Sequence, residues 1–206
     1  MEAEALIEQA VAALREGKPV LLPTDTVYGL CAAAYSDAPT RGLYRLKGRS
    51  EAQPSQLMAA SLDGLYEAMP ELRGEAGDIV RALLPGPYTL VLANPARRFR
   101  WLNGTRMDTI GVRVPNLPEA TRRVIEAVGV VVATSANDPG GANPTTLDDV
   151  PARIRAGCGA ELDAGPLPGT PSTVLDLTRA EPYVIREGAV PAAEALARVR
   201  SARGRQ

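Results

Sequence analysis

The stretch Pro23-Thr-Asp-Thr-Val-Tyr-Gly-Leu30 constrains this chain more than any other. It follows the apolar residues 19–22, which predict a buried strand. Two threonines, an aspartate and a tyrosine then come close together, and Gly29 permits the chain to turn. Small polar groups at the end of a buried strand are available to a ligand at the sheet edge. Hydroxyl and acidic residues also form ordinary turns, so the motif alone leaves a ligand site and a structural turn both open.

Apolar spacing that alternates between helix and strand periods runs through the chain and predicts an α/β fold. We expect helices over 2–16, 39–47, 61–69, 75–84, 118–128, 147–156 and 191–203. We expect strands over 19–23, 56–60, 89–93, 109–115, 129–134, 174–177 and 183–188. No internal repeat or linker interrupts the pattern. The 206 residues therefore predict a single domain, 1–206.

Composition excludes several kinds of chemistry. The chain has no histidine, which removes histidine bases, histidine metal ligands and Ser-His or Cys-His nucleophile pairs. Two cysteines are too few for a structural zinc site, and a formal net charge of -1 creates no overall basic field for nucleic acid. The acidic start lacks a signal-peptide layout, and no apolar run reaches the ~20 residues that span a bilayer. We therefore expect a cytoplasmic protein without membrane contact.

Cationic side chains at two places in the sequence could bind an anionic ligand. Lys47-Gly48-Arg49 places two charges around a glycine, which suits an anion; a solvated helix end explains the same residues, because cations are favoured there. Arg113 lies within the otherwise apolar strand 109–115 and needs a partner, since charges are rarely buried alone. A bound carboxylate or phosphate would supply bidentate hydrogen bonds, and an internal Asp or Glu would serve equally well.

Polar groups also lie at the ends of further strands. Ser135 and Asn137 follow the apolar strand 129–134, and a Gly-rich stretch comes next whose backbone N–H groups can hold phosphate. Ser172 precedes strand 174–177, and Arg186 lies within strand 183–188. If these positions converge, they form a cationic pocket for a polyanion such as a nucleoside triphosphate. Such a pocket favours catalysis by positioning and charge stabilisation.

A second class of function stays open on the residues. The predicted loop 94–108 and the C-terminal segment carry exposed-type cations and one aromatic residue, namely Arg97, Arg98, Arg100, Trp101, Arg198, Arg200, Arg203 and Arg205. Arginines beside an aromatic side chain suit an RNA-binding or ribosome-maturation module. A solvated loop anchored by Trp101 explains the loop residues without RNA.

Seven blocks in order resemble those of a known family. They are Pro-Thr-Asp-Thr-Val-Tyr-Gly-Leu (23–30), Lys-Gly-Arg (47–49), Leu-Pro-Gly-Pro-Tyr-Thr (84–89), Gly-Val-Arg-Val-Pro (111–115), Ser-Ala-Asn (135–137), Ser-Thr-Val-Leu-Asp (172–176) and Ile-Arg-Glu-Gly (185–188). Together they resemble the YrdC-like family of threonylcarbamoyl-adenylate synthases in its short, single-domain form. The resemblance implies an open, strongly twisted mixed α/β sheet, flanked by helices, with a large concave cationic cavity. This fold is similar to the α/β twist associated with double-stranded RNA binding.

The resemblance also implies a reaction. L-Threonine, bicarbonate or carbon dioxide, and ATP would give threonylcarbamoyl-AMP and pyrophosphate. A downstream threonylcarbamoyl-transferase complex would pass the threonylcarbamoyl group to adenosine 37 of tRNA. Mg²⁺ would accompany ATP, with no metal site of the protein's own.

The family motifs assign roles to individual residues here. Lys47 and Arg49 would be catalytic. Contacts to ATP would come from Lys47, Arg49, Gln53, Thr109, Ser135, Asn143 and Arg186. The threonine site would contain Thr26, Tyr28, Met58, Arg113 and Ser172, with Arg113 on the threonine carboxylate. Thr24 and Asn137 would shape the pocket.

Two residues depart from the family pattern. Gln53 stands where a cation or amide near ATP is expected, and Met58 stands where a histidine near threonine is common. These departures leave room for the sister YciO-like branch, which shares the fold and would use nucleotide with another substrate. The retained Ser135-Ala-Asn137 and Pro85-Gly-Pro87 segments favour the synthase branch.

Overall fold

The computed structural model describes residues 2–74 and 76–204. Its helices are α1 (Glu2–Arg15), α2 (Asp37–Lys47), α3 (Leu62–Ala68), α4 (Gly77–Leu83), α5 (Glu119–Val128), α6 (Ala152–Ala156) and α7 (Ala192–Arg203), with 3-10 turns η1 (Pro70–Arg73), η2 (Arg100–Leu102) and η3 (Leu147–Asp149). Its strands are β1 (Val20–Pro23), β2 (Tyr28–Ala33), β3 (Gln56–Ala59), β4 (Tyr88–Ala93), β5 (Thr109–Arg113), β6 (Val130–Ser135), β7 (Ala160–Glu161), β8 (Thr173–Asp176) and β9 (Tyr183–Arg186).

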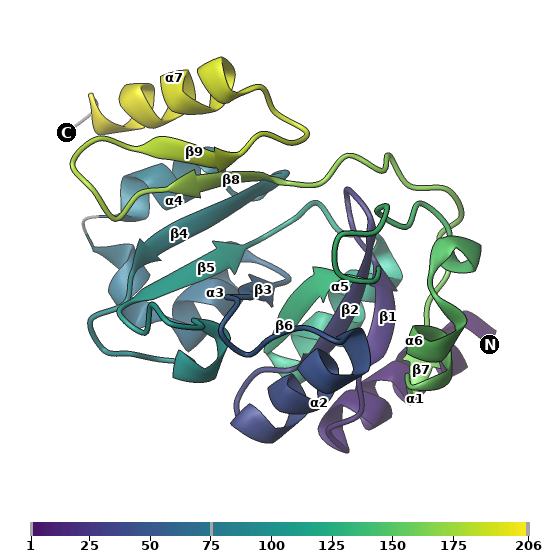
Figure 1. The fold of residues 1–206 in the computed structure, drawn as a ribbon. Coiled ribbons are helices and arrows are strands. Elements are labelled where there is room, and N and C mark those ends of the chain that lie inside the picture. Colours follow the sequence, from purple (N-terminus) through teal and green to yellow (C-terminus); the bar gives the residue numbers. More distant parts are fainter. Residues whose placement is uncertain (1, 75, 205–206) are drawn as a thin grey trace.

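Within this described part of the chain the strands form one nine-stranded sheet, in the order β7-β1-β2-β6-β3-β5-β4-β8-β9. β1 pairs with β7, β3 with β5, and β4 with β8 in parallel, whereas the other neighbours are antiparallel. The sheet is therefore mixed and open, as expected. Figure 1 shows it twisting between the β1–β2–β6 half and the β4–β5–β8–β9 half, with the connection from β7 to β8 passing between them.

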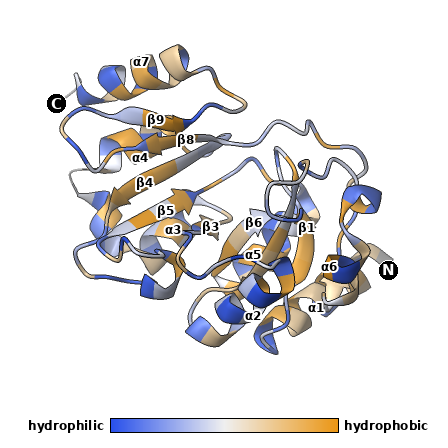
Figure 2. Cartoon of the chain, viewed as in Figure 1, coloured by the Kyte–Doolittle hydropathy of each residue, from blue (hydrophilic) through white to orange (hydrophobic). Residues whose placement is uncertain are grey.

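Strand alternation divides the apolar side chains between two faces of the sheet. Leu21 and Val132 belong to a large core cluster to which α2, α3, α4 and α7 also contribute. Their strand neighbours Leu22 and Val131 belong to a smaller cluster with residues of α1 and α5. Figure 2 shows the result: orange strands at the centre and blue residues on the outer surfaces of the helices.

The smaller core cluster covers only part of its face. It takes residues from β1, β2, β3, β6 and β7, and contains none from β4, β5 or β8. The β4–β5–β8 part of this face therefore remains open beside α1 and α5. The candidate site lies on that open part.

The structure corrects the expected elements at several places. The turn after β1 lies at Thr24–Val27 and not at Gly29. Gly29 lies inside β2, where it pairs with Leu22 and Ser135. The sequence analysis did not predict β2. The single helix expected over 147–156 is interrupted at Pro151, because the proline cannot donate the backbone hydrogen bond that a continuous helix needs. The expected helix 75–84 begins on residue 75, which lies outside the described residues; α4 is described from Gly77.

No helix in residues 2–74 and 76–204 is both long enough and apolar enough to cross a membrane.

Candidate active site

A cavity of about 290 Å³ lies on the open part of the sheet. It is lined from β3, β4, β5, β6, β8 and β9, together with the loops around residues 26, 49–55, 103–106, 143 and 171–172. The strands contribute alternate residues of one face, such as Gly111 and Arg113 of β5. None of the described residues that line the cavity is acidic, whereas four of them are arginines, namely Arg49, Arg106, Arg113 and Arg186. The lining therefore suits an anionic ligand.

The turn between β1 and β2 is built by Thr24. Its hydroxyl donates to the backbone oxygen of Val27 at 2.8 Å and accepts from the backbone N–H groups of Thr26 and Val27, both at 3.3 Å. Side-chain bonds of this kind form a tight turn without glycine. The turn places Thr26 in the cavity wall and Asp25 beside Arg113. Thr24 itself lies outside the lining of the cavity.

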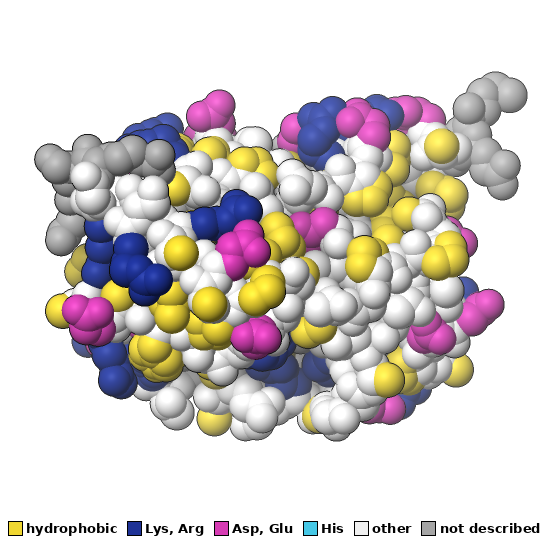
Figure 3. Space-filling model, turned by 90° about the horizontal axis from the view of Figure 1, so that it is seen from above, with side chains coloured by type: hydrophobic (Ala, Val, Ile, Leu, Met, Phe, Trp, Pro, Cys, Tyr) yellow, Lys and Arg dark blue, Asp and Glu magenta, His cyan; other side chains and the backbone are white. Residues whose placement is uncertain are grey.

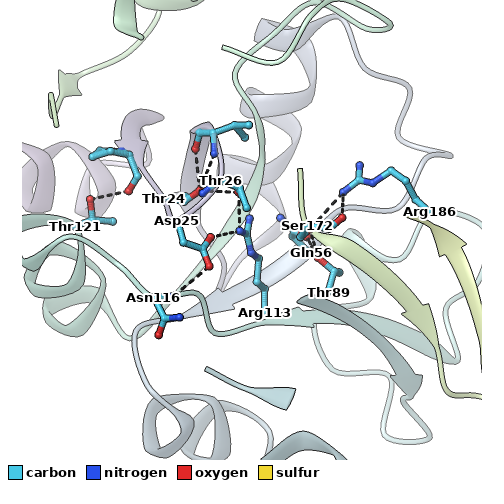
Figure 4. A network of polar contacts seen from close by, with 12 residues as sticks. Thr24, Asp25, Thr26, Gln56, Thr89, Arg113, Asn116, Thr121, Ser172 and Arg186 are labelled. Atoms are coloured by element: carbon cyan, nitrogen blue, oxygen red, sulfur yellow. Dashed lines mark hydrogen bonds and ion pairs between the residues drawn. The ribbon is translucent and has the colours of Figure 1, made fainter. Parts of the chain in front are cut away.

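Arg113 is the most buried cation of the cavity, with 4% of its surface exposed. Its Nη2 donates to Asp25 Oδ1 and to Thr26 Oγ1, the latter at 2.7 Å, as Figure 4 shows. Burial lowers the pKa of Arg113, and the Asp25 charge acts in the opposite direction. The internal acid left open by the sequence analysis is thus present. Arg113 Nε is also buried and has no hydrogen-bond partner among the described residues.

The Asp25 carboxylate is itself held in place by hydrogen bonds. Its Oδ2 accepts from the backbone N–H of Asn116 at 3.2 Å, so both carboxylate oxygens are engaged. This arrangement keeps the Arg113 guanidinium at one orientation in the cavity wall. It does not neutralise the remaining cations of the cavity.

A second polar chain begins at Arg186 on β9. Arg186 Nη2 donates to the backbone oxygen of Ser172 at 2.8 Å and approaches Ser172 Oγ at 3.3 Å. Ser172 Oγ lies 2.8 Å from Thr89 Oγ1, and Thr89 donates to Gln56 Oε1 at 2.7 Å. Figure 4 shows this chain beside Arg113. Burial, followed by the charge of Arg113, lowers the pKa of Arg186, so the two cations lie within electrostatic reach of each other.

Arg49 lies on the segment that follows α2. Gly48, with φ 70, ends that helix in the left-handed conformation that glycine adopts without strain. Arg49 Nη2 donates to Pro54 O at 2.5 Å, while its Nε is buried without a partner among the described residues. Burial also lowers the pKa of Arg49. Arg49 thus presents a partly unpaired guanidinium to the cavity.

Lys47 is 2% exposed and does not line the cavity. Its Nζ donates to the backbone oxygen of Ser135, and to the backbone oxygen and Oδ1 of Asn137, the last two at 2.8 Å. Ser135 Oγ also donates to Asn137 Oδ1, at 2.6 Å. Burial and the charge of Arg49 lower the pKa of Lys47 to about 8. In this structure Lys47 and Asn137 hold the end of β6, so Lys47 contacts the loop around the site rather than the cavity.

Eight of the expected site residues line the cavity together: Thr26, Arg49, Thr109, Arg113, Ser135, Asn143, Ser172 and Arg186. The other six lie outside its lining: Thr24, Tyr28, Lys47, Gln53, Met58 and Asn137. Four of these six differ clearly from the expected placement, namely Lys47, Tyr28, Gln53 and Met58.

Tyr28, expected at the threonine site, is fully buried on another side of β2. Its hydroxyl donates to Asp163 Oδ1 at 2.6 Å and to Gly165 O at 2.9 Å, and burial raises its pKa to about 12. Met58 is fully buried in the smaller core cluster, because the same face of β3 continues under α1 and α5 beyond the cavity. Gln53 is exposed in the loop after α2.

The sequence analysis missed several lining residues. Gln56, Thr89, Asn103 and Arg106 all contribute side chains to the wall. Arg106 donates to the fully buried Asp176 at 3.2 Å, and Asn103 is 2% exposed with both amide atoms unpaired among the described residues. Thr89 ends one of the seven blocks, so that signal was available. Gln56 offered no signal of its own, since only the pairing of β3 turns it toward the cavity.

Several of the residues proposed for an RNA surface make contacts within the chain. Arg98 pairs with Glu71 at 3.1 Å, Trp101 donates to Ala34 O at 3.0 Å, and Arg203 donates to Ala180 O at 2.6 Å. Arg205 lies outside the described residues. On the face in Figure 3, Lys and Arg side chains are interspersed with Asp and Glu.

Solved structures share this fold. Sua5 of Pyrococcus abyssi, in complex with L-threonine, matches with a TM-score of 0.84 and 34% identity over 93% of this chain and 56% of that chain. YciO of E. coli matches with a TM-score of 0.76 and 27% identity over 91% of each chain. The architecture is therefore that of the open α/β proteins represented by Sua5 and YciO.

The sequence comparison names the family. The family model described as telomere recombination, which comprises Sua5, YciO and YrdC, matches residues 12–188. The chain belongs to this family. A Mycobacterium leprae protein, provisionally named as a threonylcarbamoyl-AMP synthase, is 37% identical over 91% of this chain and 84% of its own length. The threonylcarbamoyl-AMP synthase of Bacillus subtilis is 30% identical over 89% of this chain, which spans 54% of that longer relative.

Proposed function

We propose that this chain is an L-threonylcarbamoyladenylate synthase, which converts L-threonine, bicarbonate-derived carbon dioxide and ATP into threonylcarbamoyl-AMP and pyrophosphate. The observation that carries the proposal is the buried Arg113 in a cavity whose described lining has arginines and no acid. Relatives named threonylcarbamoyl-AMP synthase, at 33% and 30% identity, support the same reaction.

Threonine binds through its carboxylate at Arg113. The guanidinium supplies a charge-assisted hydrogen bond, while Asp25 and Thr26 hold the group in place. Ser172 lies across the cavity and bounds the same subsite. The structure of Pyrococcus abyssi Sua5 with L-threonine supports threonine as the amino acid.

Two bond-forming steps complete the reaction. The amine of threonine attacks carbon dioxide, forms a C–N bond and loses a proton, which gives a carbamate. A carbamate oxygen then attacks the α-phosphorus of ATP, and the bond from the α-phosphorus to the β-bridging oxygen breaks as pyrophosphate leaves. Arg49 and Arg186 offset the negative charge that develops on the phosphates. No protein nucleophile takes part, which agrees with the absence of histidine.

Thr109, Ser135 and Asn143 contact the nucleotide from the cavity wall. Lys47 supports this part of the site through Ser135 and Asn137. Mg²⁺ enters as the counter-ion of ATP. The described lining supplies no carboxylate for it, and no group of three or more Cys, Asp or Glu residues among the described residues forms a metal site. The phosphates of ATP would hold the ion.

The product is a mixed anhydride that needs an acceptor. We propose that a threonylcarbamoyl-transferase complex uses it to modify adenosine 37 of tRNA, and that both act in the cytoplasm. The synthase itself needs no tRNA for pyrophosphate release.

The test is pyrophosphate release from MgATP with threonine and bicarbonate omitted in turn. Release that requires both substrates supports the proposal, and serine then tests selectivity. Nucleotide binding without release under any combination contradicts it and favours a YciO-like activity on another substrate, a branch whose E. coli structure is 27% identical to this chain. RNA binding that weakens steeply with salt, together with no release, would instead favour the RNA-binding class.

A further inference from the structure

Gln56 is the first residue of β3 and lies on the floor of the cavity. Its neighbours across the sheet are Gly111 on β5 and Ala133 on β6. Residues paired across strands share a face, so Gln56 stands between a position with no side chain and one with a single methyl group. Nothing from either neighbouring strand covers its amide. The register therefore opens a path from the cavity to Gln56.

Hydrogen bonds connect the Gln56 amide to Arg186 through the hydroxyl groups of Thr89 and Ser172. Thr89 donates its only hydroxyl hydrogen to Gln56 Oε1, at 2.7 Å. The 2.8 Å contact between Ser172 and Thr89 must then be donated by Ser172. Ser172 Oγ can in turn accept from Arg186 Nη2, at 3.3 Å.

This chain leads from a cation to the Gln56 carbonyl. Hydrogen bonds aligned in one direction polarise one another, so each member becomes a stronger donor. Gln56 Oε1 is occupied, and its Nε2 carries two hydrogens that no described residue accepts. The polarised amide therefore offers a strong, uncharged donor pair to the cavity.

Gln56 also lies between the two cations that the proposed reaction uses at opposite ends of the substrate. In Figure 4, the Gln56–Thr89–Ser172 group separates Arg113 from Arg186. Arg113 takes the carboxylate of the amino acid and Arg186 a phosphate. The atoms between those two groups in the intermediate are the amine and the carboxyl group newly added from carbon dioxide.

We propose that Gln56 Nε2 binds the carbamate formed from carbon dioxide and holds it for attack on the α-phosphorus. One carbamate oxygen accepts the hydrogen bond, and the other forms the bond to phosphorus as pyrophosphate leaves. An uncharged donor suits this task, because a cation paired with the carbamate would reduce its nucleophilicity more strongly. The inference rests on the proposed function and adds a residue that binds the substrate derived from carbon dioxide.

The experiment compares Gln56→Leu and Gln56→Glu with the wild type. The Km for bicarbonate is measured from pyrophosphate release at saturating ATP and threonine, and the Km for threonine at saturating bicarbonate. Gln9→Leu and Gln9→Glu make the same chemical changes at an exposed glutamine of α1, where the amide donates to Gly159 O at 3.1 Å. Circular dichroism and ATP titration check folding and nucleotide binding.

We expect Gln56→Leu to raise the Km for bicarbonate by about tenfold, the size that loss of a hydrogen bond to a charged group predicts. Gln56→Glu raises it further, because a carboxylate repels the carbamate. The Km for threonine and the affinity for ATP stay within about twofold of the wild type.

The glutamate variant separates binding from a merely structural role. It keeps the acceptor for Thr89, so a structural role predicts wild-type kinetics. If Gln56→Glu keeps the wild-type Km for bicarbonate, or only the Km for threonine changes, the inference is overturned. Gln56→Glu also decides the question if Gln56→Leu does not fold. A wild-type protein that releases no pyrophosphate refutes the proposed function itself and is thereby distinguished from failure of the Gln56 inference.

Discussion

Removing the Arg113 charge should affect stability and threonine binding by separate amounts. Arg113 and Asp25 form a pair in which the side chains are 4% and 11% exposed. Arg113→Met leaves the Asp25 carboxylate with only the Asn116 backbone N–H as a donor from this network. Breaking one partner of a buried pair costs about 3–5 kcal/mol, and the residual exposure of Asp25 places the expected loss near the lower end.

The double variant Asp25→Asn/Arg113→Met separates the two effects. It removes both charges, so no carboxylate is left buried and unpaired, and most of the lost stability should return. Threonine binding should not return, because the Arg113 guanidinium is the group proposed to bind the substrate carboxylate. Loss of a charge-assisted hydrogen bond of about 1.5–3 kcal/mol predicts a rise of roughly 10- to 100-fold in the Km for threonine.

Two assays measure these quantities. Urea unfolding at constant pH measures the free energy of unfolding of the wild type, the single variant and the double variant. Pyrophosphate release against threonine concentration measures the Km. A single variant as stable as the double variant would refute the argument that Asp25 is buried as a charge. A double variant with the wild-type Km for threonine would refute the assignment of Arg113 to the carboxylate.

Three further predictions concern the surroundings of the cavity. The pKa of Lys47 is about 8 in the folded chain against an ordinary 10.5, so the unfolded chain binds more protons between these pH values, and the free energy of unfolding should rise there by at most about 1.4 kcal/mol per pH unit. Urea unfolding at pH 7.5 and 9 measures this rise in the wild type and in Lys47→Met. An equal rise in the variant contradicts the prediction. Gly104 has φ +56 and a Cβ there would lie 2.3 Å from Ala52 O, whereas Gly140 has φ +79 and a Cβ there would meet nothing within 4 Å. Gly104→Ala should therefore lower the melting temperature more than Gly140→Ala, whose cost in stability is about 1 kcal/mol. Equal losses in melting temperature would show that the 52–55 segment moves to make room for the new side chain. Met58→His should lower the melting temperature by burying an imidazole in an apolar cluster without changing the Km for threonine; an altered Km would place position 58 in the site.

Much of the fold could be predicted from local patterns. The apolar run 129–134 and the alternation around Arg113 correctly indicated β6 and β5, since a strand's period depends only on neighbouring residues. β2 was missed because Tyr28 and Gly29 were interpreted as the end of a polar turn. The turn lies at Thr24–Val27 and is made by the Thr24 side chain, and β2 is stabilised by pairing with β6, which is remote in sequence.

The candidate site was predicted in part. Arg113 required a partner on grounds of burial alone, and the structure supplies Asp25 while leaving Nε free. Lys47 and Arg49 lie two residues apart, so the sequence offered no reason to separate them. The end of α2 separates them in space: Lys47 is bonded to the end of β6, while Arg49 faces the cavity.

Gln53, in the loop before β3, and Gln56, the first residue of β3, differ in what the sequence could show about them. Residue types and their spacing were enough to predict strands that end in hydroxyl, amide and arginine side chains, an α/β fold and the absence of histidine chemistry. The folded arrangement was needed to place Gln56 in the cavity, Gln53 in solvent and Met58 in the core. Residue type and spacing are local properties, whereas access to the cavity depends on strand register and on which part of a sheet face the helices cover.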